Sequence, residues 1–279
     1  MTQATSPGLI DDALQRAGDY LLGRETPSGG FCFYRWGGIE EPNLSDTDHA
    51  LTALRLLGRT VPDPSTVRAF AARFRPTAQP DSLMHLLGIE LALGRDPLDD
   101  PGLRRSIDAL RWSEVPPADS THVEGWLRRT RLVAALRQRV GLPLDSDRLT
   151  TALGRLMHGG GFGSTPNLID THVALEIADL CGRPLRRDDV RGFVDAVQIP
   201  AHGFTLTPNS RMGRLDLVVS GIACCHLLDL PVRHAADALN LVLACQAASG
   251  AFANAPGALP DIEHTHSGVV LLQKLVTAH

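Results

Sequence analysis

Apolar residues recur along much of the chain at intervals of three and four residues, the spacing of one face of an α-helix. In residues 236–252, for example, Leu239, Leu241, Val242 and Cys245 repeat in this way. Runs of alternating β-branched residues do not occur, so we expect negligible strand content. The pattern predicts an all-α protein.

One phrase recurs four times along the chain. Each copy begins with glycine and phenylalanine, continues through a loop rich in Pro, Asn and Gly, and then enters an apolar helical segment; the copies lie at 29–58, 160–182, 202–230 and 249–275. Another helical pattern precedes each Gly-Phe pair, so each repeat is predicted to be a helical hairpin. Two weaker repeats, which include residues 80–94 and 117–138, bring the number to six.

A helical hairpin cannot bury its apolar face alone, so stacked repeats must pack against one another in a solenoid or a closed ring. We therefore predict an α/α toroid of six helical hairpins. The second helix of each pair is expected on the inside of the ring. Residues 1–279 are expected to form a single domain.

Composition narrows the class of protein. The chain is 43% hydrophobic with a formal net charge of −4 spread along its length, so it can bury a substantial core and nucleic acid is not expected as a partner. The first residues do not resemble a secretory signal, and the longest apolar run, interrupted by His226, is too short for a transmembrane segment. We expect a cytoplasmic protein.

Two segments resemble a known signature. CQAASGAF (245–252) and VQIPAHGF (197–204) are similar to the Gln…Gly-x-aromatic signature of squalene-hopene cyclases and related triterpene cyclases, with phenylalanine where that signature usually has tryptophan. The toroids of these enzymes also resemble the β subunits of protein prenyltransferases. The resemblance covers nearly the whole chain and implies an α/α toroid that acts on a small apolar isoprenoid in its central cavity.

Polar residues stand where the second helix of several repeats begins. Aligned on the following threonine, Asp46, Asp170, Asp216 and His264 share one place, with Leu217 at the threonine position of the fifth repeat. One interpretation is helix capping, because polar side chains accept hydrogen bonds from the free N–H groups of a first turn. The other is that a toroid brings these first turns to one rim of its cavity, where they surround a single pocket.

The resemblance implies an acid at this rim. In class II terpene cyclases an aspartate two residues before the threonine protonates an alkene or epoxide, within a D-x-D-D-T or D-C-T element. PDIEHT resembles that element with Glu263 at the acid position, flanked by Asp261 and His264, and ADST resembles the shorter form with Asp119 as the acid. The acid must stay protonated in a dry pocket beside a hydrogen-bond partner. Asp261 or His264 can serve Glu263 in that way.

The first repeat, NLSDTD, departs from the cyclase element. Ser45 takes the acid position, and Asp46 and Asp48 lie on either side of Thr47. Both aspartates remain candidates because the Gly-Phe lead-in resembles that of the family.

The second implied chemistry uses zinc. In protein prenyltransferase β subunits, zinc is held by D-x-C in one repeat and by the histidine of D-x-x-H-T in the next. Asp216 and His264 match, but Val218 replaces the cysteine, so a zinc site needs His266 as a substitute ligand. Asp170 and His172, together with Asp216, form a second possible set. The cyclase interpretation requires no cofactor.

Arg211 and Arg214 precede Asp216 and are the candidates for binding an anionic group. Aromatic residues make up only 5% of the chain, which is sparse for stabilising carbocations and argues against a large polycyclisation.

The leading hypothesis is a proton-initiated terpene cyclase-like enzyme for a small prenyl substrate. The alternatives are a prenyltransferase-like transfer with a modified metal site and a non-catalytic lipid-binding or scaffold toroid. The need for a partner subunit is left open.

Overall fold

The computed structural model describes residues 7–61, 63–74, 79–96, 100–185 and 188–277. Within these ranges the chain forms twelve helices and two short antiparallel ribbons, which confirms the prediction of a mostly helical protein with little strand. The chain divides into two compact lobes. We call Met1–Leu103 with Leu239–His279 the terminal lobe, and Arg104–Ala238 the central lobe. The closure of six hairpins into one ring and one domain stays a prediction.

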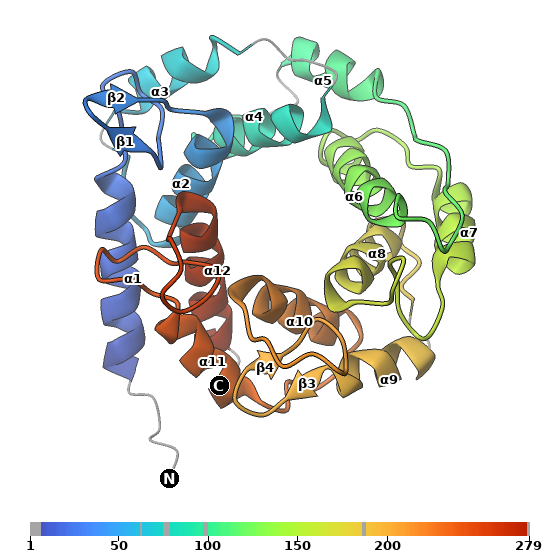
Figure 1. The fold of residues 1–279 in the computed structure, drawn as a ribbon. Coiled ribbons are helices and arrows are strands. Elements are labelled where there is room, and N and C mark those ends of the chain that lie inside the picture. The colour runs from blue at the N-terminus through green and yellow to red at the C-terminus, as the bar shows by residue number, and fades with distance from the viewer. Residues whose placement is uncertain (1–6, 62, 75–78, 97–99, 186–187, 278–279) are drawn as a thin grey trace. The chain divides into compact units, whose positions relative to one another are not determined.

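The terminal lobe is built around a helix from the first repeat. Its elements are α1 (Pro7–Leu22), β1 (Arg35–Trp36), β2 (Ile39–Glu40), α2 (Leu44–Leu56), α3 (Pro64–Ala71), α4 (Pro80–Ala92) and α12 (Ile262–Thr277). Helix α2 packs against α4 on one side and α12 on the other, and α1 packs against α2 and α12 (Figure 1). The first and last helices of the chain therefore meet in one core.

The central lobe has the same local arrangement. Its elements are α6 (Val123–Arg139), α7 (Ser146–Leu156), α8 (Leu168–Leu180), α9 (Asp188–Ala196), β3 (Gln198–Ile199), β4 (Gly203–Phe204) and α10 (Leu215–Leu227). Helix α8 packs against α6 and α10, with α7 also against it (Figure 1). Apolar residues occupy several faces of α8 because other helices cover it on more than one side. The lobe boundaries fall within α5 (Pro101–Asp108) and α11 (Ala235–Ala244).

The repeated phenylalanine and threonine join each Gly-Phe loop to the helix that follows. In three repeats the threonine hydroxyl accepts a hydrogen bond from the phenylalanine N–H, at 3.0 Å for Phe31 and Thr47, 3.1 Å for Phe162 and Thr171, and 3.0 Å for Phe252 and Thr265. The same hydroxyl donates to the carbonyl oxygen four residues earlier. All six residues are fully buried. The hydroxyl thus satisfies two backbone groups that water cannot reach.

The threonine of α8 provides a test of this role. Thr171→Val is expected to lower the free energy of unfolding by about 1–3 kcal/mol, because it leaves the Phe162 N–H unpaired while nearly preserving volume. Thr150→Val is the control, because the Thr150 hydroxyl is only partly buried in α7 and bonds within its own helix. We expect a change of less than about 0.5 kcal/mol for the control. Equal effects in urea denaturation would contradict a special role for the repeated hydroxyl.

The fifth repeat is shifted by one residue from the alignment on threonine. Helix α10 begins after Arg214, whose backbone is extended at φ −146° and ψ 155°. Leu217 therefore lies three residues after the cap, the place of Asp46 and Asp170, and Val218 takes the threonine place. The predicted equivalence of Asp216 with the other aspartates is wrong, because the backbone transition at Arg214, not the sequence pattern, determines where the helix starts.

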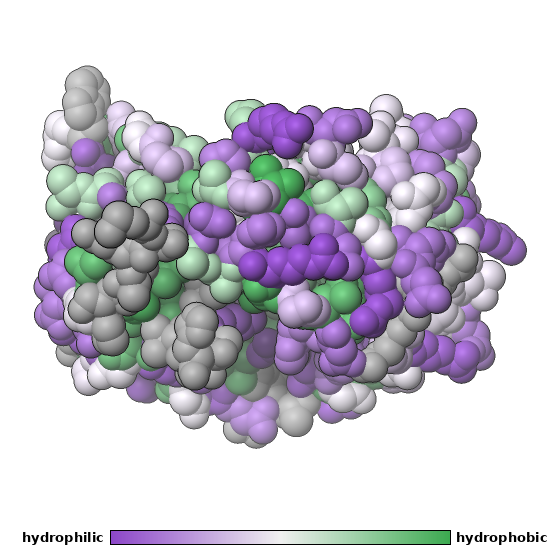
Figure 2. All heavy atoms as spheres, turned by 90° about the horizontal axis from the view of Figure 1, so that it is seen from below, coloured by the Kyte–Doolittle hydropathy of each residue, from purple (hydrophilic) through white to green (hydrophobic). Residues whose placement is uncertain are grey.

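The surface of the protein carries both hydrophobic and hydrophilic residues. On the face in Figure 2, hydrophobic residues show in small groups between hydrophilic ones. Large exposed apolar side chains include Leu259, Met212 and Leu9, which lie far apart in the sequence. Among the described helices, none is both long enough and apolar enough to cross a membrane.

Candidate functional site

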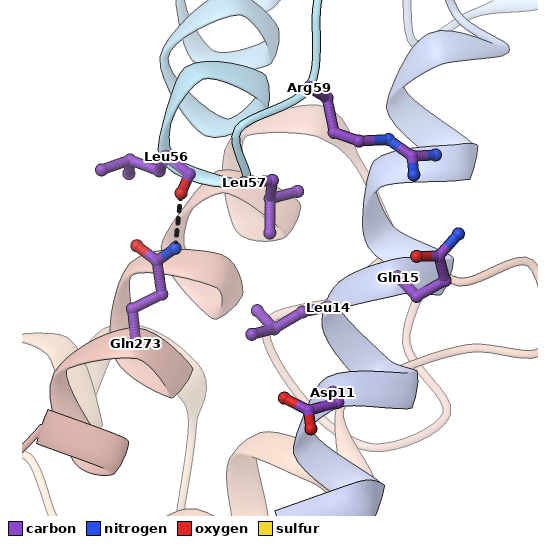
Figure 3. A pocket seen from close by; sticks show the side chains of 7 residues that line it. All are labelled: Asp11, Leu14, Gln15, Leu56, Leu57, Arg59 and Gln273. Atoms are coloured by element: carbon purple, nitrogen blue, oxygen red, sulfur yellow. Dashed lines mark hydrogen bonds between the residues drawn. The ribbon is translucent and has the colours of Figure 1, made fainter.

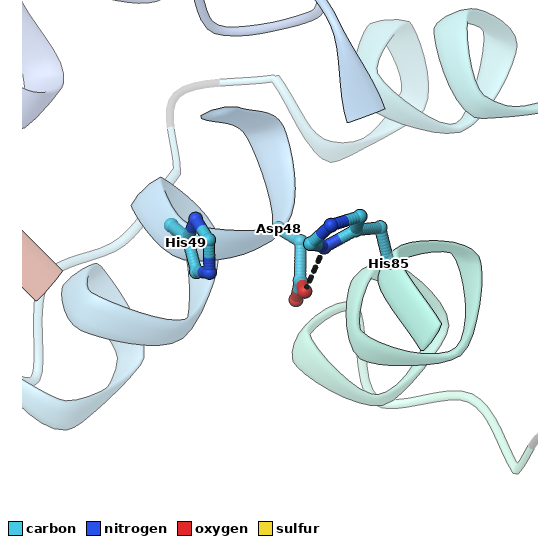
Figure 4. A group of neighbouring side chains, drawn as sticks. All are labelled: Asp48, His49 and His85. Atoms are coloured by element: carbon cyan, nitrogen blue, oxygen red, sulfur yellow. Dashed lines mark hydrogen bonds and ion pairs between the residues drawn. The ribbon is translucent and has the colours of Figure 1, made fainter. Parts of the chain in front are cut away.

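Four polar side chains gather where α2, α4 and α12 pack together. We call Asp48 and His49 of α2, His85 of α4 and His266 of α12 the histidine cluster. The Nδ1 atom of His85 lies 2.9 Å from Oδ2 of Asp48. The ring of His49 forms a T-shaped pair with His85, with centroids 5.4 Å apart, and stacks on His266 with centroids 5.3 Å apart. Figure 4 shows Asp48 and His85 reaching toward each other from neighbouring helices, with His49 beside them.

The carboxyl group of Asp48 is held in a narrow space between α2 and α4. Its Oδ1 atom accepts a 3.3 Å hydrogen bond from the Thr52 hydroxyl, and Oδ2 faces His85. A Cβ atom on Gly88 of α4 would lie 2.0 Å from Oδ1, so only glycine leaves room for the carboxyl group. The Asp48 side chain is 13% exposed, which makes it a carboxyl group largely removed from water.

The electrostatics of the cluster keep two of its imidazoles neutral. Burial lowers the pKa of His49, although the negative charges of Asp48 and Glu263 oppose this effect. Burial and the neighbouring charge of His49 lower the pKa of His266 to about 4. Near pH 7 both rings are therefore uncharged and each keeps a nitrogen lone pair that can accept a proton.

The PDIEHT element forms the start of α12. The Asp261 carboxylate accepts a 2.7 Å hydrogen bond from the His264 N–H, and its other oxygen lies 2.6 Å from His264 Nδ1. Burial alone would raise the pKa of Asp261, but these hydrogen bonds and the charge of His264 outweigh it and hold that pKa below its ordinary value. Asp261 is thus an ionised cap, which supports the capping interpretation at this position. Glu263 is exposed on the first turn.

Asp46 connects the Gly-Phe loop to α2. Its Oδ2 atom accepts hydrogen bonds from the Phe33 N–H and from Asn43 Nδ2, both at 2.9 Å. The Asn43 side chain in turn accepts from the Asp46 N–H at 2.8 Å. This reciprocal pair satisfies backbone and side-chain groups at the helix start, so asparagine, rather than aspartate, is the cap in this repeat.

The central lobe holds Asp170 and His172 in separate contacts. Asp170 is 5% exposed and accepts a 2.7 Å hydrogen bond from Asn167 Nδ2. Burial raises the pKa of Asp170, because this hydrogen bond only partly offsets it. His172 Nε2 lies 3.4 Å from a carboxylate oxygen of Glu176, whose other oxygen lies 3.4 Å from Arg131. His172 therefore faces Glu176 along its own helix.

The remaining predicted residues, Arg211, Arg214, Asp216 and Asp119, belong to the central lobe. Arg214 forms a bidentate ion pair with Asp216, with N–O distances of 3.0 and 2.9 Å, and Arg211 is exposed in the loop before α10. Asp119 is exposed in a turn before α6. The predicted ligand set of Asp216, His264 and His266 draws on both lobes and stays a prediction, as does the set of Asp170, His172 and Asp216 and the role of both arginines as anion binders.

The raised pKa of Asp170 predicts a pH dependence of stability. Between its ordinary pKa of 3.8 and the raised value, the folded protein binds more protons than the unfolded chain, so the free energy of unfolding falls as pH rises through this window. Asp170→Asn removes the ionisation while keeping an acceptor for Asn167. The variant is expected to gain stability relative to the unmodified protein as pH rises from about 4 to about 7. A constant difference in urea denaturation across this range would contradict the prediction.

Sequence reasoning identified Asp48 and His266 but missed His49 and His85. Their distance along the chain from the start of each helix would have identified them. Asp48 and His266 lie five residues after Asn43 and Asp261, where α2 and α12 begin. His49 and His85 lie six residues after Asn43 and Gln79, where α2 and α4 begin. All four residues therefore lie in the second turn of α2, α4 or α12, at similar distances from the start of each helix.

A separate pocket lies at the other end of α2. It has a volume of about 220 Å³ and is lined by Asp11, Leu14, Gln15, Leu56, Leu57, Arg59 and Gln273. Gln273 Nε2 donates a 2.7 Å hydrogen bond to the Leu56 carbonyl, which joins the end of α2 to α12 (Figure 3). Leu56 is the last residue of α2, about two turns after His49, and none of the pocket residues belongs to the histidine cluster.

Neither a protein-family model nor a curated protein sequence matches the chain. Several solved structures do. A variant of the type II terpene cyclase MstE from Scytonema, in complex with its substrate geranylgeranyl dihydroxybenzoate, aligns with a TM-score of 0.59 at 14% identity over 98% of this chain and 99% of that one. The apo form of MstE aligns with a TM-score of 0.54 at 16% identity, over 97% and 99%.

A third structure, an MstE variant in complex with the product merosterolic acid A, has a TM-score of 0.55 at 14% identity over 97% of both chains. At these identities the likeness concerns the fold. It confirms the predicted resemblance of this chain to terpene cyclases at the level of the fold.

Proposed function

We propose that this protein is a terpene cyclase-like enzyme that starts cyclisation of a small prenyl substrate by protonating an alkene, with Asp48 as the acid. The observation that carries the proposal is the largely buried Asp48 carboxyl group, 2.9 Å from His85 at the junction of three helices. The fold supports it, because a structure of similar fold has been solved with a geranylgeranyl-bearing substrate.

The other carboxyl groups fit the role of acid less well. Glu263 and Asp119 are exposed to water, so neither lies in the dry pocket that an acid of this kind requires. Asp261 is held in its ionised form by His264. Asp46 is occupied by hydrogen bonds from the loop it secures. Asp48 alone among the predicted catalytic carboxyl groups combines burial with a histidine on a different helix.

The proposed reaction consumes no net proton. Transfer of the Asp48 proton forms a C–H bond at one alkene carbon, leaves a cation at the other and converts the acid to a carboxylate. Attack of a second alkene on the cation forms the ring bond and moves the cation. Loss of a proton from a neighbouring carbon then restores an alkene. The neutral rings of His49 and His266 can accept that proton, and His85 can return one to Asp48.

Deuterium incorporation tests this proposal. A panel of prenyl diphosphates and prenylated aromatic acids is incubated with the protein in D₂O, and the products are examined by mass spectrometry. A proton-initiated cyclisation gives cyclic products that carry one deuterium at the protonated carbon. Release of diphosphate with attachment of the prenyl group to an acceptor would favour the prenyltransferase-like alternative. Binding without conversion would favour the lipid-binding alternative, and both outcomes would contradict the cyclase.

A further inference from the structure

From the arrangement of donor atoms we infer that Asp48, His49 and His85 form a site for one divalent transition-metal ion of the zinc type. The site shares no ligand with the sets predicted from the prenyltransferase resemblance. One carboxylate oxygen and one nitrogen from each ring all lie within 4.8 Å of one another. Metal binding rests on this geometry alone, whereas its effect on turnover rests on the proposed function.

The chemistry of the donors matches zinc. Imidazole nitrogen and carboxylate oxygen are common zinc ligands, and three protein ligands with an open fourth position are typical of accessible zinc sites. Bonds of about 2.0–2.2 Å in a tetrahedral site place ligand atoms roughly 3.4 Å apart. Asp48 Oδ2 and His85 Nδ1 are already 2.9 Å apart. The nitrogen of His49 lies within 4.8 Å of both atoms, so the three donors already surround one position.

The positions of the ligands are set by helix packing. Asp48 and His49 are neighbours on α2, and adjacent residues on a helix point in different directions. His85 of α4 contacts both side chains, because its Nδ1 atom lies 2.9 Å from Asp48 Oδ2 and its ring packs against that of His49 at an interplanar angle of 79°. His266 of α12 stacks on His49 and holds the plane of that ring. Two separate helix contacts thus orient the donors.

The metal would replace the proton in the contact between Asp48 and His85. On binding, that proton passes to solvent, Asp48 coordinates as a carboxylate, and His85 coordinates through Nδ1. The same atoms carry the acid function proposed above, so an occupied site cannot donate a proton to an alkene. Bound zinc is therefore an inhibitor of the proposed reaction.

The test starts from full-length protein stripped of metal by EDTA. Equilibrium dialysis against Zn²⁺ followed by elemental analysis is expected to give one zinc per chain. Co²⁺ is expected to give the visible absorption of a four-coordinate site. Because zinc binds the folded state, the melting temperature should rise with zinc concentration. Failure of the unmodified protein to bind either ion would overturn the inference.

Variants locate the ion. His85→Ala and His49→Ala are each expected to weaken zinc binding by at least about tenfold, the smallest effect typical of losing a residue that supports a metal. Asp48→Asn keeps the side-chain shape, removes the charge and is expected to weaken binding likewise. His172→Ala is the matched control, because His172 pairs with Glu176 in the central lobe. Circular dichroism establishes that each variant is folded, and equal affinity in all four variants would overturn the site.

Two further results separate the inference from the proposed function. Zinc that binds as expected to a protein without cyclase activity contradicts the function and supports the site. Cyclisation that is lost in proportion to zinc occupancy supports both. Cyclisation that continues at full zinc occupancy overturns the assignment of the metal ion to Asp48 and His85.

Discussion

Asp48→Asn is expected to reduce turnover of a prenyl substrate by at least about 10²-fold, the scale typical of a lost general acid. The amide keeps the volume and can still contact Thr52 and His85, so the packing between α2 and α4 should persist. It lacks a proton acidic enough to transfer to an alkene. Steady-state turnover per folded molecule, with the melting temperature measured on the same sample, reports the effect.

Glu263→Gln is the matched control for this experiment. Glu263 occupies the acid position of the PDIEHT element, but it is exposed on the first turn of α12. We expect little change in turnover, because an exposed carboxyl group lacks the dry pocket that the proposed acid requires. A large loss for Glu263→Gln with full activity for Asp48→Asn would return the acid role to Glu263. If neither variant changes turnover, the proton-initiated reaction is contradicted.

Phe162→Ala is expected to lower the free energy of unfolding by about 3–5 kcal/mol. The Phe162 ring is fully buried in the central lobe and belongs to a core cluster with Trp126, Leu153 and Ile177. Removing it leaves a cavity that these rigid helices cannot fill. Urea denaturation, followed by far-ultraviolet circular dichroism, measures the loss.

Tyr34→Ala is the control for the loss of an aromatic ring. Tyr34 belongs to the loop of the first repeat and is 57% exposed. The expected change is within about 0.5 kcal/mol, because the ring is already in contact with water. A cost below about 1 kcal/mol for Phe162→Ala would mean that the Gly-Phe element does not anchor its repeat.

The histidine cluster shows which part of the candidate site local sequence patterns predict. The resemblance of PDIEHT to the cyclase element implies Glu263 as the acid, but the same residues describe a capped helix start equally well. In the structure Asp261 is the cap of α12, while Asp48, one residue past the threonine of the first repeat, faces a histidine of another helix. Asp261 and Asp48 look similar in sequence because both carry carboxylates near the first turn of a helix. They differ in burial, which depends on neighbours far along the chain.

The sequence by itself determined the local architecture of this protein. A Gly-Phe pair, a loop rich in Pro, Asn and Gly, and a threonine before an apolar stretch predict a loop followed by an apolar helix. The resemblance to terpene cyclases rests on the segments 197–204 and 245–252. Tertiary structure decided which polar groups meet. His85 lies 37 residues from Asp48, and His266 comes from the last helix, so the spacing from each cap gives their level on the helices but not their contact. Only the packing of α2 against α4 and α12 removes Asp48 from water and brings three rings beside it, because burial and close contact are properties of packed helices rather than of any one segment.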